Sequence, residues 1–286
     1  MRFVGAHIYV VLAALLFATG GAAIKLSLLS NWQIAGLRSG IAATVLVALV
    51  PAWRGFDIRA LLVGVVFAVT MILFVTANTL TTATNAIFLQ TTAPLYVLLL
   101  GPLLLREHLR RTDLPVVALL GTGAALFFVT AEPPLATAPS PVAGNITAAA
   151  SGVTWALTVV GLRWLGRISS TPGHDPAGIA IVLGNTLAFV FCLPFAWPLV
   201  GGTPIDWAIV GYLGVFQIGL AYVCLVRGVR GTRAFDVALL LVLEPVLSTL
   251  LAWVVHNEVP STWAAAGSVV IVLGLILHAV QAAEPS

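Results

Sequence analysis

The sequence predicts an all-α membrane protein of ten transmembrane helices, arranged as two inverted five-helix repeats. Composition is the first reason, because 60% of the residues are hydrophobic and only 8% are charged. Soluble proteins average about 45–50% and 25% for these classes. A soluble domain could not cover so much apolar surface, so lipid must surround the chain. The number of apolar runs and an internal repeat are the other two reasons.

Ten apolar runs can be counted, each near the roughly 20 residues that cross a bilayer. They leave little sequence for a soluble domain. The runs lie at about 6–26, 33–53, 60–80, 86–105, 113–131, 143–164, 177–198, 207–227, 235–255 and 262–281.

The first run follows Arg2 and ends near small residues at 20–23, so it could be read as a signal peptide. It is longer than the apolar core of 7–15 residues that signal peptides use. We therefore expect it to remain in the protein as the first transmembrane helix.

The internal repeat has a constant spacing of 151 residues without a gap. Each copy holds an apolar run with an internal proline, a terminal glutamate and a second apolar run. The matching residues are Pro94, Glu107 and Gly123 in the first copy, and Pro245, Glu258 and Gly274 in the second. Such weak repeats are typical of secondary transporters, whose substrate site lies between the repeats.

Basic residues predict the orientation. With the N-terminus in the cytoplasm, 11 of the 13 basic residues fall in inner segments, as the positive-inside rule requires. Five spans per half is an odd number, so the second half must enter the membrane inverted. We expect a first repeat at 1–131, an outer linker rich in proline and alanine at 132–141, and a second repeat at 142–286. Both termini would be cytoplasmic.

These features resemble the drug/metabolite transporter superfamily, in its EamA-type ten-helix form. The resemblance covers almost the whole chain and rests on Pro94 with Glu107, Pro245 with Glu258, the tripeptide 243–245 and Arg38. Within the superfamily, the chain is most similar to bacterial exporters of aromatic amino acids and toxic organic cations. The resemblance implies a bacterial inner-membrane exporter that works by alternating access. Its central cavity would be lined by helices 1, 3, 4, 6, 8 and 9, with helices 5 and 10 at the periphery.

Polar and aromatic residues inside the spans are the candidates for substrate binding, because polar groups are costly in lipid. In the fourth span, steps of three and four place Asn85, Phe88, Thr92 and Tyr96 on one helical face. This stripe could line a cavity, or its polar groups could hydrogen-bond to neighbouring helices. In the same span, Pro94 removes a backbone hydrogen bond and predicts a kink that could act as a hinge.

Other spans offer similar candidates. The sixth carries Ser151 and Trp155 on a stripe, and this deep tryptophan could form the wall of an aromatic pocket or pack in the core. Further candidates are Phe74 and Asn78 in the third span, and Gln217 and Tyr222 in the eighth.

Glu244 is the sharpest single residue, since it lies near the middle of the ninth span, directly before the second hinge candidate Pro245. It could bind a substrate cation, carry a coupling proton, or stay neutral and hydrogen-bond beside the proline kink. Arg38 and Lys25 could attract a carboxylate at the outer mouth. Both lie close enough to the interface for their side chains to snorkel, which favours a structural role.

Two further features concern structure. Gly36 and Gly40 form a G-x-x-x-G pattern that predicts close packing of the second span, within one chain or across a dimer. Glu107 and Glu258 end their helices beside aqueous loops, where we expect them to make helix-terminal hydrogen bonds and gating contacts.

An intramembrane enzyme is the distant alternative. No His-Glu-x-x-His, Gly-x-Ser-x-Gly or nucleotide-binding P-loop motif occurs. Cys192 and Cys224 are too few for a disulfide framework or a metal site. The sequence therefore predicts a non-enzymatic carrier with no cofactor and no metal. Its partners would be a small amphipathic solute, the lipid bilayer and possibly protons, and not nucleic acid. Organic cations, drugs and sugar-type metabolites remain alternative substrates.

Overall fold

The computed structural model describes residues 2–50, 56–104, 111–129, 133–168, 175–229, 240–241 and 243–283. These residues form helices and one isolated bridge between Leu135 and Ala138. The predicted all-α fold is thus confirmed. The helices are α1 (Arg2–Leu26), α2 (Asn31–Leu49), α3 (Ile58–Leu80), α4 (Ala83–Thr91), α5 (Ala93–Leu104), η2 (Arg111–Asp113), α6 (Leu114–Leu126), α7 (Pro141–Ile168), α8 (Pro176–Ala196), α9 (Pro204–Tyr212), η3 (Leu213–Leu220), α10 (Ala221–Val229), α12 (Leu243–His256) and α13 (Thr262–Ala283).

Most of these helices coincide with single predicted spans. Among the described residues, seven helical segments are long and apolar enough to cross a membrane, with α9, η3 and α10 counted as one. The fifth and ninth spans correspond to the shorter apolar helices α6 and α12. The beginning of the predicted ninth span and the candidate residue Glu107 lie outside the described residues.

The fourth span is broken rather than only kinked. Helix α4 ends at Thr91 and α5 begins at Ala93, so the break falls just before Pro94. Proline has no N–H to continue the helix, and its ring clashes with the carbonyl of the residue four positions earlier. The Thr92 hydroxyl donates to the Leu89 carbonyl at 2.6 Å and satisfies one backbone acceptor at the break.

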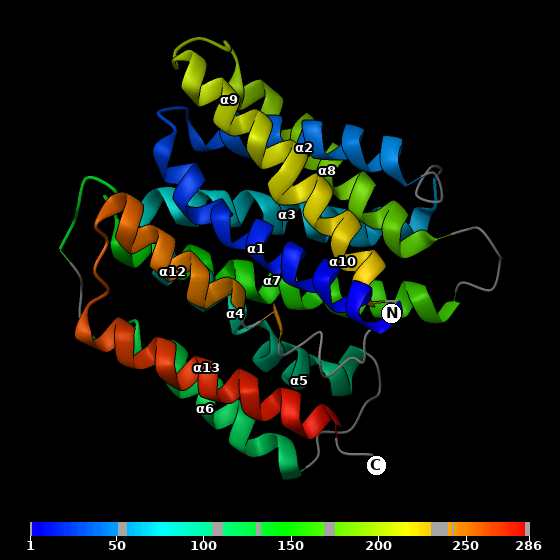
Figure 1. Cartoon of the computed structure of the whole chain (residues 1–286), viewed down its shortest axis with the longest axis vertical. Helices are drawn as coiled ribbons and strands as arrows, with labels where there is room; N and C mark the ends of the chain where they lie inside the picture. Colours follow the sequence, from blue (N-terminus) through cyan, green and yellow to red (C-terminus); the bar gives the residue numbers. More distant parts are fainter. Residues whose placement is uncertain are drawn as a thin grey trace.

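The two halves pack through matching pairs of helices, which supports the inverted repeat. The predicted repeat equates α1 with α7, α3 with the α9–η3–α10 segment, and α4–α5 with α12. The contact of α3 with α7 has its counterpart in the contact of α1 with η3 and α10 (Figure 1). The contact of α4–α5 with α7 likewise corresponds to that of α1 with α12. Finally, α2 packs on its equivalent α8, and α6 packs on its equivalent α13.

Glycines set the closest of these crossings. A Cβ at Gly36 would lie 2.8 Å from the Cβ of Cys192, and one at Gly40 would lie 2.9 Å from the Phe189 ring. Both neighbours belong to α8. The G-x-x-x-G pattern therefore packs α2 against α8 within the chain.

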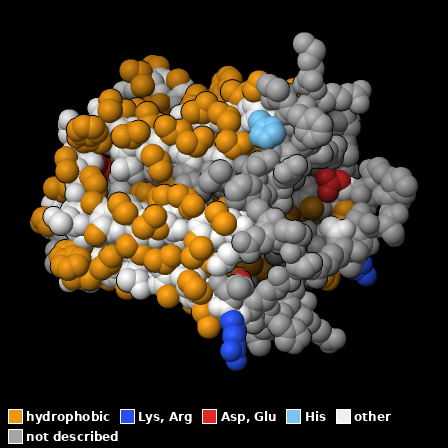
Figure 2. All heavy atoms as spheres, turned by 60° about the horizontal axis from the view of Figure 1, so that its bottom comes forward, with side chains coloured by type: hydrophobic (Ala, Val, Ile, Leu, Met, Phe, Trp, Pro, Cys, Tyr) orange, Lys and Arg blue, Asp and Glu red, His pale blue; other side chains and the backbone are white. Residues whose placement is uncertain are grey.

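Apolar side chains cover most of the described surface seen in Figure 2. Strongly exposed examples come from several helices, as expected for a lipid-facing belt. They include Leu62, Val65, Val190, Phe191, Trp253, Val254 and Val269.

Candidate functional site

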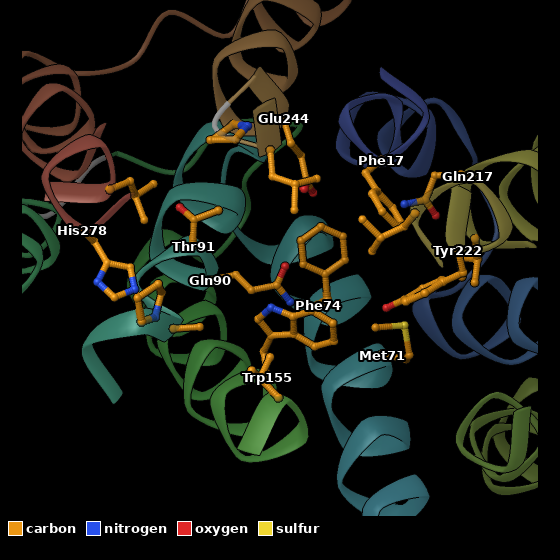
Figure 3. A pocket seen from close by; sticks show the side chains of 18 of the residues that line it. Phe17, Met71, Phe74, Gln90, Thr91, Trp155, Gln217, Tyr222, Glu244 and His278 are labelled. Carbon is orange, nitrogen blue, oxygen red and sulfur yellow. The ribbon is translucent and has the colours of Figure 1, made fainter. Parts of the chain in front are cut away.

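A cavity of about 450 Å³ lies between the two halves (Figure 3). Its described walls come from α1, α3, the α4–α5 break, α7, η3, α10 and α12, as the family resemblance implies. Two contributions differ from that expectation: α2 supplies Arg38, and α13 supplies Leu275 and His278. The tenth helix still lies at the edge of the bundle, where α13 packs mainly on α6, as expected, although its Leu275 and His278 side chains reach the cavity.

Four aromatic side chains line the cavity: Phe17, Phe74, Trp155 and Tyr222. The ring centroids of Phe17 and Tyr222 lie 5.3 Å apart in an edge-to-face arrangement. Behind them, Phe67 is 1% exposed and contacts the rings of both Tyr222, at 5.9 Å, and Trp155, at 6.3 Å. These separations fall within the range of favourable aromatic pairs, so Phe67 holds two cavity walls in place.

The break in the fourth span presents polar groups to the cavity. Gln90 and Thr91 end α4 and both line it. The Gln90 amide donates to the Ser151 hydroxyl of α7 at 2.7 Å. In Figure 3 the Gln90 amide lies beside the Trp155 indole. Ser151 therefore acts on the cavity indirectly, by orienting Gln90.

An unusual segment of the eighth span carries Gln217. Residues Leu213–Leu220 form a π-helix, a geometry that is frequent at functional sites. The Gln217 amide needs Gly20 opposite it, because a Cβ there would lie 2.8 Å from the Gln217 Nε2 atom. The close approach of α1 to η3 thus places Gln217 at the cavity.

Two charged side chains also line the cavity. Arg38 is 1% exposed, so it does not snorkel to an interface as the sequence favoured. Its Nη1 donates to Gln217 Oε1 at 3.4 Å, its Nη2 donates to the Met71 carbonyl at 3.3 Å, and its Cζ lies 5.9 Å from the Phe74 ring centroid. Glu244, in the first turn of α12, points its carboxylate into the same space (Figure 3).

The predicted site residues divide into two groups. The cavity brings together Phe74, Trp155, Gln217, Tyr222 and Glu244, with both hinge candidates, Pro94 and Pro245, on its wall.

The remaining candidates do not line the cavity. The Asn78 amide donates to the Phe74 carbonyl, and Phe88 stacks on Phe127 with ring centroids 6.4 Å apart. Tyr96 packs at the crossing of α5 with α7, where a Cβ at Gly152 would lie 3.3 Å from its ring. Thr92 caps the break described above. The stripe expected along the fourth span therefore does not line the cavity.

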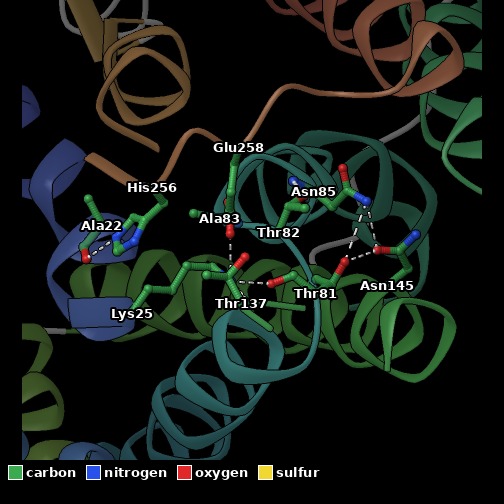
Figure 4. A network of polar contacts seen from close by, with 10 residues as sticks. All are labelled: Ala22, Lys25, Thr81, Thr82, Ala83, Asn85, Thr137, Asn145, His256 and Glu258. Carbon is green, nitrogen blue, oxygen red and sulfur yellow. Dashed lines mark hydrogen bonds and ion pairs between the residues drawn. The ribbon is translucent and has the colours of Figure 1, made fainter. Parts of the chain in front are cut away.

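Asn85 belongs to a polar network where the end of α3 and the start of α4 meet α7 (Figure 4). It donates to Thr81 Oγ1 at 3.4 Å and to Asn145 Oδ1 at 3.2 Å. Thr81 also donates to Asn145 Oδ1 at 2.8 Å, which joins the start of α4 to α7.

An ion pair completes this closed end, which we define by Lys25, Thr81, Thr137 and Glu258. Lys25 Nζ lies 3.0 Å from Glu258 Oε1, and both side chains are 2% exposed. Lys25 also donates to the carbonyls of Thr81 and Thr137, while Glu258 Oε2 accepts the Ala83 N–H at 2.9 Å. The side chains therefore tie α1 to the α3–α4 turn, the linker and the end of α12.

Sequence reasoning missed several cavity residues. Phe17 and Met71 sit in uniformly apolar runs and carry no local signal. Gln90 did carry a local sequence signal, since it is a polar amide four residues before Pro94. Arg38 was noticed, but only its contacts with η3 and α3 reveal that it faces the cavity.

Comparison with known proteins agrees with this arrangement. The model of the EamA-like transporter family matches residues 4–130 and 142–280. The chain belongs to this family. As a member of the EamA-like transporter family it is an integral membrane protein, and the two matched segments correspond to the two halves of the chain.

Two curated relatives are similar to this EamA-like chain. An uncharacterized transporter of Methanothermobacter thermautotrophicus is 25% identical over 217 residues, 72% of this chain and 59% of that protein. The aromatic amino acid exporter YddG of Ancylobacter novellus is 31% identical over 190 residues, 64% of this chain and 61% of that protein. The matches thus span about three fifths of each relative. A crystal structure with 23% identity covers 97% of both chains with a TM-score of 0.64, which shows the shared fold.

Proposed function

We propose that this EamA-like protein exports aromatic and other apolar amino acids. The observation that carries the proposal is the cavity between the halves, whose walls combine four aromatic rings with two amides, a guanidinium and a carboxylate. A mainly apolar pocket of this size with a few convergent polar groups suits a small amphipathic ligand. The name of the Ancylobacter relative, an aromatic amino acid exporter, supports the same substrate class.

Alternating access would come from rocking the two repeats, 1–131 and 142–286, about the linker at 132–141. The hydrogen-bonded closed end and the cavity at mid-depth fit a carrier closed on one side. Pro94 and Pro245 would act as hinges, because both line the cavity and Pro94 directly follows the break between α4 and α5. The positive-inside pattern favours cytoplasmic termini. In a bacterial inner membrane the closed end would then face outward.

Organic cations are the second candidate substrate class. Glu244 offers a negative charge, and the faces of Phe17, Phe74, Trp155 and Tyr222 could attract a cation. Arg38 opposes this alternative because it would repel a cation that enters the same cavity.

Efflux from intact cells tests the proposed function. Bacteria that overproduce the wild-type protein should retain less labelled phenylalanine than cells with an empty vector. Trp155→Ala should restore retention toward the vector level, because it removes a cavity wall.

Trp164→Ala is the matched control, since Trp164 lies on the same helix but is 38% exposed on the lipid side. This variant should export like the wild type. Equal retention in wild-type and vector cells, or equal losses in both tryptophan variants at equal expression, would count against the proposal.

A further inference from the structure

Arg38 has an incomplete set of partners for a buried cation. A guanidinium carries five N–H donors in a fixed fork. Both of its side-chain bonds to oxygen, at 3.4 and 3.3 Å, exceed the usual 2.7–3.2 Å range of such hydrogen bonds. Its Nε has no hydrogen-bond partner. Within the described ranges no carboxylate lies at ion-pair distance from Arg38, whereas the buried Lys25 is paired with Glu258.

A buried cation without a counter-ion is strongly unfavourable in proteins generally. Buried charges are therefore kept where they pair with something, and intramembrane charges mark ligand sites. The cavity lies beside this guanidinium, because Arg38 lines it. A ligand anion is the partner that the site lacks.

The packing of α2 on α8 does not use Arg38. The face of α2 that carries Gly36 and Gly40 packs on α8 through direct backbone approach. A helix turns about 100° per residue, so Arg38, two residues beyond Gly36, lies on the opposite face. It faces η3 and α3, where its two hydrogen-bond acceptors lie. Packing alone therefore does not account for a charge at this position.

The cavity also offers the opposite charge. Glu244 belongs to α12 of the second half, whereas Arg38 belongs to α2 of the first half. Aromatic rings complete the same cavity, and Phe74 contacts the guanidinium itself. An α-amino acid has a carboxylate, an ammonium group and a side chain, which match these three kinds of wall.

We propose that Arg38 binds the carboxylate of the transported amino acid while Glu244 binds its ammonium group. The inference rests on the proposed function and narrows the substrate class to zwitterions. Simple amines and organic cations are excluded as substrates. Because the two charges lie on different halves, a bound zwitterion also links the halves that must move together.

Competition in liposomes tests the inference with the wild-type protein. Counterflow of labelled phenylalanine should be inhibited by unlabelled phenylalanine at roughly tenfold lower concentration than by phenylalaninamide, in which a neutral amide replaces the carboxylate. 3-Phenylpropionate, which lacks the ammonium group, should also be weaker than phenylalanine.

Variants assign the carboxylate contact to Arg38. Arg38→Gln should weaken inhibition by phenylalanine and by 3-phenylpropionate roughly tenfold but leave phenylalaninamide unchanged. Arg38→Lys keeps the charge and should restore part of the difference. Glu244→Gln is the companion variant, and it should affect phenylalaninamide but not 3-phenylpropionate.

The outcomes separate the inference from the proposed function. If phenylalaninamide competes with the wild type as well as phenylalanine does, Arg38 does not read the carboxylate, although amino-acid transport stands. Equal losses for all ligands in Arg38→Gln would give Arg38 a structural role and overturn the inference. If Arg38→Gln does not fold, the wild-type competition series decides alone. Absence of any wild-type counterflow overturns both.

Discussion

Several residues that do not line the cavity fix the positions of the side chains that do. Phe67 supports Trp155 and Tyr222, Ser151 orients Gln90, and Gly20 leaves room for Gln217. The sequence predicted Trp155, Gln217 and Tyr222 as candidates because polar and aromatic groups stand out in apolar spans. It could not rank them against Asn85 or Phe88, since only tertiary packing determines which helical face meets the cavity.

Glu244 makes a testable contribution at this scale. If the Glu244 carboxyl group loses its proton when a substrate ammonium group binds, substrate binding is coupled to proton release. Glu244→Gln removes the titratable group, so the pH dependence of phenylalanine counterflow should become flat in this variant. Wild-type-like pH behaviour of Glu244→Gln in the same liposomes would remove Glu244 from proton coupling.

At the scale of helices, the apolar runs located the spans well, and Pro94 indicated where the fourth is interrupted. The complete break at Thr92 depends on local hydrogen bonds that the pattern did not specify. The π-helix at Leu213–Leu220 had no sequence signal, because its residues are as apolar as those of an ordinary span. It arises where Gly214 and Gly219 pack closely on Ile41 and Val45 of α2.

Helix ends form the closed end, and its ion pair should stabilise this conformation. Glu258→Gln would leave Lys25 buried without a carboxylate, an unfavourable state that opening of the closed end would relieve. Ser248 is 2% exposed and lies deeper along α12, close to Gly21 of α1. A cysteine substituted at position 248 therefore reports on opening of the closed end through its access to a thiol reagent.

The experiment uses Ser248→Cys with Cys192 and Cys224 replaced by alanine. A membrane-impermeant thiol reagent is applied from the closed side. It should label the cysteine at position 248 roughly tenfold faster when Glu258→Gln is also present. A tenfold increase corresponds to a change of about 1.4 kcal/mol in the free energy of opening. Val259→Thr, next to Glu258 but 72% exposed and outside the ion pair, is the control. An unchanged labelling rate in Glu258→Gln would mean that the ion pair does not hold this end shut.

On the scale of the whole molecule, matching helix pairs place one cavity between two halves, and side-chain contacts across the halves close one end. This arrangement gives each half a distinct share of the site: Arg38, Phe74 and Gln90 from the first, and Trp155, Gln217, Tyr222 and Glu244 from the second. A rocking motion would then change access to the cavity while the lining residues within each half keep their arrangement.

Counterflow of labelled phenylalanine tests the central claim most directly. Liposomes containing the purified protein and loaded with unlabelled phenylalanine should accumulate label transiently and saturably, and other apolar amino acids should compete. Empty liposomes provide the control. Uptake no greater than that of empty liposomes would contradict the assignment of aromatic amino acids as substrates.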